Sequence, residues 1–188
     1  MPTFTRQSSM LYPDHWLQWL GRFVGQPCHG LEVGCYEGRS TLWFIDNICT
    51  HERARMVAVD WFKGNDDAVE AALNRSQREL FDANLAAHLG TKLHWVLPEK
   101  SSIALPSLIS KYCMFDWIYI DGSHEACDVL SDSVFSWQLL KAGGVLFWDD
   151  YDNDRFTGVK TAIDSFLACH EGKYKGLHCG SQFAVEKL

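Results

Sequence analysis

The sequence predicts an α/β domain with a doubly wound, mostly parallel sheet. Short apolar runs alternate with segments of helical periodicity along the chain. The central runs IYI and VLFW are apolar throughout, which is typical of strands buried on both faces. No linker rich in glycine, serine or proline divides the 188 residues, and 47% hydrophobic content is sufficient for one core. We therefore expect a single domain spanning residues 1–188.

The elements follow in regular alternation. Strands are expected, in chain order, at 30–33, 56–59, 93–97, 117–120, 145–148, 174–178 and 182–186. Helices are expected between them at 39–47, 77–89, 105–111, 126–140 and 159–170. The last two runs flank Gly180 and are expected to form an antiparallel pair at the edge of the sheet. The Gly143-Gly144 pair is expected to form a tight turn from helix to strand.

Residues 1–27 are expected to form a lead-in segment with an amphipathic helix. Trp16, Trp19, Leu20 and Phe23 fall at helical spacing, and Asp14 precedes them as the candidate N-cap. This aromatic stripe is expected to pack in the core.

Composition excludes several classes of protein. The formal net charge is −7 and the basic residues are scattered, so nucleic acid is not expected as a partner. Seven cysteines without a C-x-x-C pattern indicate neither a disulfide framework nor a zinc cage. The N-terminus lacks the apolar region of a signal peptide, and no run of 18 apolar residues suggests a membrane span. We expect a cytoplasmic protein that does not bind membranes.

Sheets of this kind bind ligands at the carboxyl ends of their strands. The first predicted strand ends in LEVGCYEG, which places Glu32, Gly34 and Gly38 in a strand–turn–helix context typical of nucleotide-binding turns. In a dinucleotide-binding turn the middle glycine lets the backbone approach a pyrophosphate, but Tyr36 stands there and disfavours NAD or FAD. S-adenosylmethionine (SAM) has no phosphate and carries a sulfonium and an ammonium, for which the carboxylate of Glu32 is suited. The alternative is a tight turn with a buried acid at the end of the strand.

Two further strand ends extend this hypothesis. Asp60 follows the second strand, where an acid can accept hydrogen bonds from two ribose hydroxyls, although many such aspartates only cap a turn. After the third strand, Ser101 and Ser102 are candidates for the adenine edge. The segment 61–76 is long enough to cover a cofactor or bind substrate.

Five segments carry a resemblance to a known family. EVGCYEGRST, VDWFKG, YIDGSHEACDVLSD, LLKAGGVLFWDDY and GVKTAIDSFL, within roughly residues 28–187, resemble successive motifs of class I SAM-dependent methyltransferases. The likeness is to the small "methyltransferase domain 24" type, related to metal-dependent O-methyltransferases acting on catechols and macrolide sugars. The resemblance implies a seven-stranded Rossmann-like sheet with a reversed last strand and SAM over the first two strand ends.

The resemblance implies that Glu32, Gly34 and Gly38 match the family's first motif and that Asp60 is its ribose-binding acid, and the sequence adds further candidates for SAM binding. The expected residues are Glu32, Gly34, Tyr36, Gly38, Ser40, Asp60, Trp61, Ser101, Asp121 and His124. Lys100 departs from the family, because an acid is common near adenine at that position.

A second group of polar residues follows strands four and five. Asp121 begins the segment DGSH, and Asp149 and Asp150 follow VLFW. These strand ends are expected to be neighbours, and three carboxylates there would repel each other by about 4 kcal/mol per pair at 4 Å and an effective dielectric constant of 20. A divalent ion such as Mg²⁺ would relieve this repulsion. The resemblance also implies that Asp121, Asp149 and Asp150 bind metal. The alternative is that Asp149 caps a loop and Asp150 faces solvent.

Asp121 and His124 are the candidate catalytic residues. A bound metal would hold two vicinal hydroxyls of a small-molecule acceptor and lower the pKa of one of them. His124 has a pKa suited to a general base, although a lone histidine near a turn is often structural. The related sugar enzymes have an acid two residues after the first metal ligand, where this chain has Ser123.

The sequence thus predicts transfer of a methyl group from SAM to a hydroxyl of a small molecule, with assistance by Mg²⁺ as an open option. An NAD-linked oxidoreductase and a non-catalytic, methyltransferase-like binding domain are the alternatives. Dimerisation through an exposed edge strand or the aromatic N-terminal helix is a further hypothesis.

Overall fold

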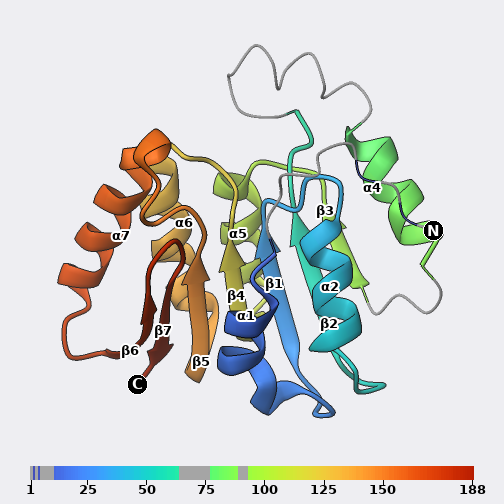
Figure 1. The fold of residues 1–188 in the computed structure, drawn as a ribbon, viewed down its shortest axis with the longest axis horizontal. Coiled ribbons are helices and arrows are strands. Elements are labelled where there is room, and N and C mark those ends of the chain that lie inside the picture. The colour runs from blue at the N-terminus through green and yellow to red at the C-terminus, as the bar shows by residue number, and fades with distance from the viewer. Residues whose placement is uncertain (1, 3, 5–10, 64–76, 89–92) are drawn as a thin grey trace.

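The protein is built on one seven-stranded sheet, seen in the computed structural model in Figure 1, which describes residues 2, 4, 11–63, 77–88 and 93–188. The strands are β1 (His29–Val33), β2 (Arg55–Val59), β3 (Leu93–Leu97), β4 (Phe115–Ile120), β5 (Leu140–Trp148), β6 (Tyr174–Cys179) and β7 (Phe183–Lys187). Their order across the sheet is β3-β2-β1-β4-β5-β7-β6. The strand order reverses at β1, and this is where ligands bind in doubly wound sheets.

The first five strands are parallel, and β7 runs antiparallel to both β5 and β6. The predicted mostly parallel sheet with an antiparallel pair at its edge is therefore confirmed. The reversed strand β7 is inserted between β5 and β6, so β6 forms the outer edge.

Helices cover both faces of the sheet (Figure 1). They are α1 (Pro13–Leu20), α2 (Arg39–Asn47), α4 (Gln77–Ala86), α5 (Ser101–Ser110), α6 (Ala126–Leu139) and α7 (Thr157–Cys169), with short 3₁₀ turns η1 (Gly21–Phe23) and η3 (Asp154–Phe156). One core cluster joins α5, α6 and α7 to one face of the sheet, and another joins α1 and α2 to the opposite face. Alternate residues at the ends of β4 and β5 enter the two clusters, as the pleat requires. In β4, for example, Ile118 belongs to the first cluster and Tyr119 to the second.

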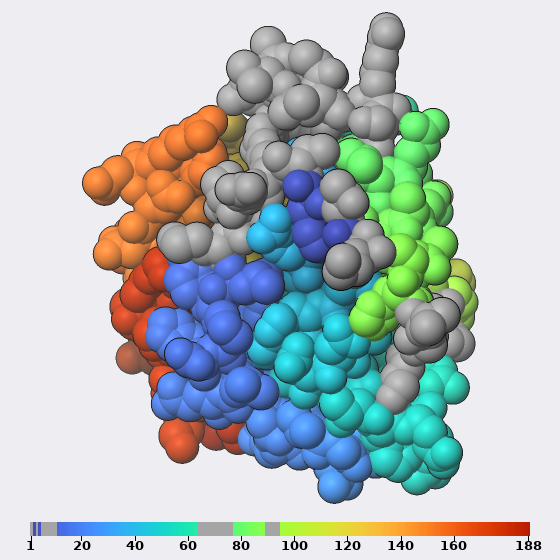
Figure 2. All heavy atoms as spheres, turned by 45° about the vertical axis from the view of Figure 1, so that its right-hand side comes forward, coloured from blue at the N-terminus to red at the C-terminus, as the bar shows by residue number. Residues whose placement is uncertain are grey.

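The aromatic stripe of α1 lies in the core, as predicted. Trp16, Trp19 and Leu20 are buried, and α1 lies beside α2 on the face shown in Figure 2. The indole nitrogen of Trp16 donates to the side-chain oxygen of Gln182 at 3.0 Å, which joins α1 to the turn between β6 and β7. The prediction of Asp14 as the N-cap is wrong. The helix begins at Pro13, whose ring suits the first helical position, and its N-cap is Tyr12, two residues before Asp14.

Two predicted boundaries are wrong by several residues. Helix α5 begins at Ser101 rather than at 105, because the carbonyl of Lys100 accepts from the amides of Ile103 and Ala104 and so starts the helix before Pro106. Strand β5 begins at Leu140 rather than at 145. The Gly143-Gly144 pair lies inside it, near an irregularity in the pairing with β4.

Most of the segment 61–76, predicted to cover a cofactor or bind substrate, lies outside the described residues, which include only its first three positions. No helix in the described part of the chain is long and apolar enough to cross a membrane.

Candidate active site

The register of the sheet brings the ends of its central strands into one row. Val33 at the end of β1 pairs with Val59 of β2 on one side and with Ile120 of β4 on the other, and Ile120 pairs with Trp148 of β5. The next residue of each strand therefore lies at the same edge. These residues are Gly34, Asp60, Asp121 and Asp149.

Backbone hydrogen bonds extend this row beyond the strands. The amide of Gly34 donates to Val59 at 2.8 Å, and that of Asp121 donates to Val33 at 2.7 Å. The amide of Asp149 donates to Ile120 at 3.0 Å. The loops that carry the predicted site are thus tied to the rigid sheet.

The turn after β1 requires glycine at residue 34. Gly34 has a φ of +86°, and a Cβ there would collide with the carbonyl group of Asp121. The constraint on Gly34 is therefore close packing of two backbones. Gly38 has a φ of +84°, and a Cβ there would lie 3.0 Å from the ring of Phe81. Both glycines also permit a left-handed backbone that other residues rarely adopt.

Asp60 organises the same turn. One of its carboxylate oxygens accepts from the amides of Cys35 and Tyr36, each at 2.9 Å, and the other accepts from the amide of Phe62 at 2.7 Å. The side chain of Cys35 is a further hydrogen-bond partner of this carboxylate. Burial raises the pKa of Asp60, while the backbone donors oppose this rise.

Glu32 lies beneath the turn rather than on its surface. It is fully buried, and its two carboxylate oxygens accept from the hydroxyls of Ser40 and Thr41. Burial raises its pKa to about 7, and the two hydroxyls oppose this rise. The side chain therefore anchors the first turn of α2 to β1.

A cleft of about 1470 Å³ opens above the row of strand ends. All of the predicted site residues line it except Glu32 and Gly38. The predicted residues that line the cleft thus follow five different strands, and Glu32 and Gly38 lie outside its lining.

The end of the cleft near β2 and β3 carries Trp61 and Ser101. The ammonium group of Lys100 lies 4.4 Å from the centre of the Trp61 ring. The hydroxyl of Ser101 interacts with Asp132, a buried acid of α6 whose pKa is raised to about 7 mainly by burial. Asp132 also lines the cleft and was not among the predicted residues.

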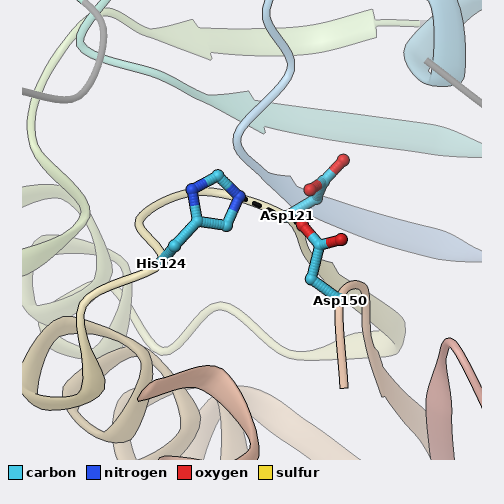
Figure 3. Close-up of side chains that lie close together, drawn as sticks. All are labelled: Asp121, His124 and Asp150. Atoms are coloured by element: carbon cyan, nitrogen blue, oxygen red, sulfur yellow. Dashed lines mark ion pairs between the residues drawn. The ribbon is translucent and has the colours of Figure 1, made fainter. Parts of the chain in front are cut away.

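At the other end, Asp121, His124 and Asp150 converge (Figure 3). Each offers one ligand atom, and these atoms lie within 4.8 Å of one another. The Nε2 atom of His124 is 3.1 Å from the Oδ2 atom of Asp150. The imidazole stacks on the ring of Phe156, with centroids 3.7 Å apart.

Local structure directs Asp150 toward this cluster. Its φ is +56°, a left-handed backbone that aspartate tolerates better than most residues. The side chain of Asn153 donates to its Oδ1 atom at 2.7 Å, which leaves Oδ2 facing His124. Burial tends to raise the pKa of Asp150, but the hydrogen bonds from His124 and Asn153 outweigh burial and lower it.

Asp149 lies beside the cluster but is held differently. Its Oδ2 atom accepts from the hydroxyl of Tyr119 at 2.8 Å, and its Oδ1 atom accepts from the amide of Asp150 at 3.0 Å. The same tyrosine hydroxyl lies 3.1 Å from a carboxylate oxygen of Asp121. The structure therefore groups Asp121 and Asp150 with His124, and it ties Asp149 to Tyr119.

The electrostatics of this end suit a cation. Burial raises the pKa of Asp121 well above its ordinary value, and the charges of Asp149 and Asp150 act in the same direction. A cavity of about 10 Å³, lined in part by Asp121, His124 and Asp150, adjoins the cluster. This volume is about that of one small probe sphere. Oxygen and nitrogen donors around such a space fit a single divalent ion.

Sequence reasoning missed Tyr119 and Phe156. Tyr119 had a detectable signal, because residues i and i+2 of a strand share a face and Tyr119 stands two residues before Asp121. Phe156 had none, since its contact with His124 depends on the path of the loop after β5.

Comparisons with known proteins agree with this architecture. The chain matches the methyltransferase domain family (Methyltransf_24) over residues 31–151, which include the four residues of the row. It therefore belongs to this family, and its class is that of the class I SAM-dependent methyltransferases with a Rossmann-like fold. Among curated protein sequences, none matches the chain.

Solved structures share the fold at low sequence identity. The O-methyltransferase NovP has a TM-score of 0.70 at 17% identity, and the match covers 93% of this chain and 77% of that one. TomG from Streptomyces achromogenes, an O-methyltransferase involved in tomaymycin synthesis and solved with SAM, has a TM-score of 0.62 at 17% identity, with 96% and 81% covered. A putative rRNA methylase from Clostridium thermocellum has a TM-score of 0.63 at 17% identity, with 98% of each chain covered.

Proposed function

We propose that this protein transfers the methyl group of SAM to a hydroxyl group of a small molecule. The observation that carries the proposal is the single cleft that joins the glycine turn and Asp60 at one end to Asp121, His124 and Asp150 at the other. A cofactor site and a site for activating an acceptor are thus continuous.

SAM would lie across the row of strand ends. Its amino acid portion would contact the turn at Gly34 and the loop of Asp121, and its ribose would lie against the carboxylate of Asp60, which lines the cleft. Its adenine would lie near Trp61 and Ser101. Glu32 would act indirectly, by holding Ser40 and the start of α2 in place.

The glycine turn favours SAM over a dinucleotide. Phosphates bind to free backbone N–H groups at such turns. Here the amides of Cys35 and Tyr36 donate to Asp60, so two candidate phosphate donors are already used and a carboxylate stands behind them. A pyrophosphate would meet negative charge at the point where it needs donors.

The end of the cleft that contains Asp121, His124 and Asp150 is the acceptor end, where the methyl acceptor would bind. A divalent ion would complete this end. Asp121 and Asp150 would hold it, and either Asp149 or His124 would complete the set. When bound, the ion would neutralise the carboxylates and favour ionisation of an acceptor hydroxyl. The protein's own contribution is orientation, because methyl transfer requires the oxygen to be in line with the sulfonium methyl.

The hydroxyl proton needs an acceptor. His124 is the imidazole predicted for this task, and the carboxylate of Asp149, which accepts from the amide of Asp150, is the second candidate. Tyr119 would act as a positioning residue, since its hydroxyl contacts both Asp149 and Asp121.

The charge of the cleft favours a small neutral or cationic acceptor over nucleic acid. Among the described residues that line the cleft, the lysines and arginines are Arg39, Lys100 and Arg155. Carboxyl groups greatly outnumber them. Phosphate-rich RNA requires the opposite balance. The fold shared with a putative rRNA methylase is therefore not a reason to propose an RNA substrate.

Isothermal titration with S-adenosylhomocysteine (SAH) and NAD⁺ tests the cofactor. We expect SAH to bind and NAD⁺ not to bind, and we expect Asp60→Ala to weaken SAH binding because the turn loses its internal acceptor. Asp164→Ala, which removes a carboxylate of α7 that pairs with Tyr151, is a control outside the row. Binding of NAD⁺ without SAH would overturn the proposal.

A further inference from the structure

The acceptor end of the cleft contains a nitrogen atom that could bind a metal ion. The metal ligands predicted from the sequence have oxygen atoms alone. The imidazole of His124 faces the carboxylates of Asp121 and Asp150 (Figure 3). Its ring is fixed on one side by stacking on Phe156 and is only about a quarter exposed. The Nε2 atom, rather than the apolar edge of the ring, points toward Asp150.

The distances suit a shared ion. Two ligands about 2.2 Å from one ion, at adjacent octahedral corners, lie about 3.1 Å apart, and opposite corners lie about 4.4 Å apart. The Nε2 atom of His124 and the Oδ2 atom of Asp150 are 3.1 Å apart, and all three ligand atoms lie within 4.8 Å of one another. The cavity of about 10 Å³ against these residues provides room for one ion.

Asp149 is less available as a ligand than its place in the sequence suggests. Both of its carboxylate oxygens accept hydrogen bonds, one from Tyr119 and one from the amide of Asp150. Asp150 has one oxygen bound to Asn153 and the other directed at His124. The loop after β5 thus directs one oxygen of Asp150 at His124, whereas Asp149 lies beside the cluster with both of its oxygens engaged in hydrogen bonds.

We infer that Asp121, His124 and Asp150 bind a divalent ion as a mixed nitrogen and oxygen set, which favours Mn²⁺ or a later transition-metal ion over Mg²⁺. Mg²⁺ selects oxygen ligands, whereas imidazole suits transition metals. The role of this ion in methyl transfer rests on the proposed function, but its binding does not. With His124 as a ligand, Asp149 is left as the group that accepts the hydroxyl proton.

The opposing interpretation is a plain ion pair. A protonated His124 at 3.1 Å would neutralise Asp150 without any metal. In that case the imidazole competes with a metal, and removing it would leave Mn²⁺ affinity unchanged or raise it. The effect of His124→Ala on Mn²⁺ affinity therefore distinguishes the two interpretations.

Electron spin echo envelope modulation of Mn²⁺ bound to the full chain provides the direct test, because it detects nitrogen nuclei bonded to the ion. We expect a ¹⁴N modulation in the unsubstituted protein and its loss in His124→Asp. Bound Mn²⁺ without the ¹⁴N modulation, or no saturable binding of Mn²⁺, would overturn the inference.

Titrations with Mn²⁺ and Mg²⁺ give an independent readout. His124→Ala should lower Mn²⁺ affinity at least about tenfold, since even the loss of an outer partner of a metal ligand costs that much. His124→Asp, which restores an all-oxygen set, should lower the ratio of Mn²⁺ to Mg²⁺ affinity. Asp149→Asn should lower both affinities together and leave the ratio unchanged, because it alters charge without altering the donors.

A matched control is available just after α4, where a histidine pairs with an acid of α2. His88 forms an ion pair with Asp46 at 2.7 Å, outside the cleft. His88→Ala should leave Mn²⁺ binding unchanged. SAH titrations of every variant report on the fold and on the proposed function separately. Binding of Mn²⁺ without binding of SAH would refute the proposed function but not the metal site. Binding of SAH without binding of Mn²⁺ would refute the metal site but not the cofactor.

Discussion

The backbone of Gly34 lies so close to the carbonyl of Asp121 that no side chain fits between them. The turn after β1, which would hold the cofactor, and the loop after β4, which would activate the acceptor, are thus in direct contact. Displacing one displaces the other.

Gly34→Ala should therefore be far more destabilising than an ordinary glycine substitution. Gly172→Ala is the control, because Gly172 has a φ of +76° but a Cβ there would meet no atom within 4 Å. The left-handed backbone alone costs about 1–2 kcal/mol. We expect Gly34→Ala to lower the free energy of unfolding in urea by at least about 2 kcal/mol more than the control. Equal losses would show that the two loops are not packed as described.

Glu32 should make the protein less stable as the pH rises from about 4.5 to about 7. Its pKa is raised from 4.5 to about 7 by burial, so the folded state holds a proton that the unfolded state releases. Stability is full below pH 4.5 and falls until the folded-state pKa is passed. The shift corresponds to a loss of about 3 kcal/mol.

Glu32→Gln removes this titration. The free energy of unfolding in urea should be measured at pH 4.5 and at pH 8. Between these values it should fall by up to about 3 kcal/mol less in the variant than in the unsubstituted protein. Glu171→Gln, at an exposed turn, serves as the surface control. A constant difference between Glu32→Gln and the unsubstituted protein would mean that Glu32 is not buried with a raised pKa.

Tyr119→Phe tests the positioning of the acids. The substitution keeps a ring that stacks on Phe147, at 4.8 Å between centroids, and removes the hydroxyl shared by Asp149 and Asp121. Mn²⁺ affinity should fall by about 10–100-fold, as is typical when a partner of a metal ligand is lost. SAH affinity should stay within about twofold of the unsubstituted protein. An unchanged Mn²⁺ affinity would show that Tyr119 does not position the acids for metal binding.

The buried bond between Trp16 and Gln182 should show energetic coupling. Trp16→Phe leaves the Gln182 oxygen without its donor at 3.0 Å, and an unpaired buried acceptor costs about 1–3 kcal/mol. Gln182→Leu leaves the indole nitrogen unpaired. The double variant should cost less than the sum of the two single variants by about 0.5–3 kcal/mol. Strict additivity would indicate that the bond contributes nothing.

Much of this arrangement could be predicted from the sequence because a parallel sheet aligns its carboxyl ends. That rule alone placed Asp60, Asp121 and the acid pair after β5 at one edge. The alternation of side chains across a strand would have predicted more. Glu32 lies between Leu31 and Val33, which face the α5–α7 layer, so its side chain must face α2.

Other features could not be predicted, because they depend on loop paths rather than on strand alignment. The left-handed backbone of Asp150 and its bond to Asn153 decide which acid of the pair meets His124. Nothing in the letters DDYDN distinguishes the two acids. The stacking of Phe156 on His124 likewise joins two loops through space.

A crystal structure with SAH and Mn²⁺ tests the central claim most directly. We expect an anomalous Mn²⁺ peak between Asp121, His124 and Asp150. The SAH sulfur should lie at the same end of the cleft, and the SAH ribose should contact Asp60. SAH bound with its sulfur directed away from Asp121, or a metal bound elsewhere, would contradict it.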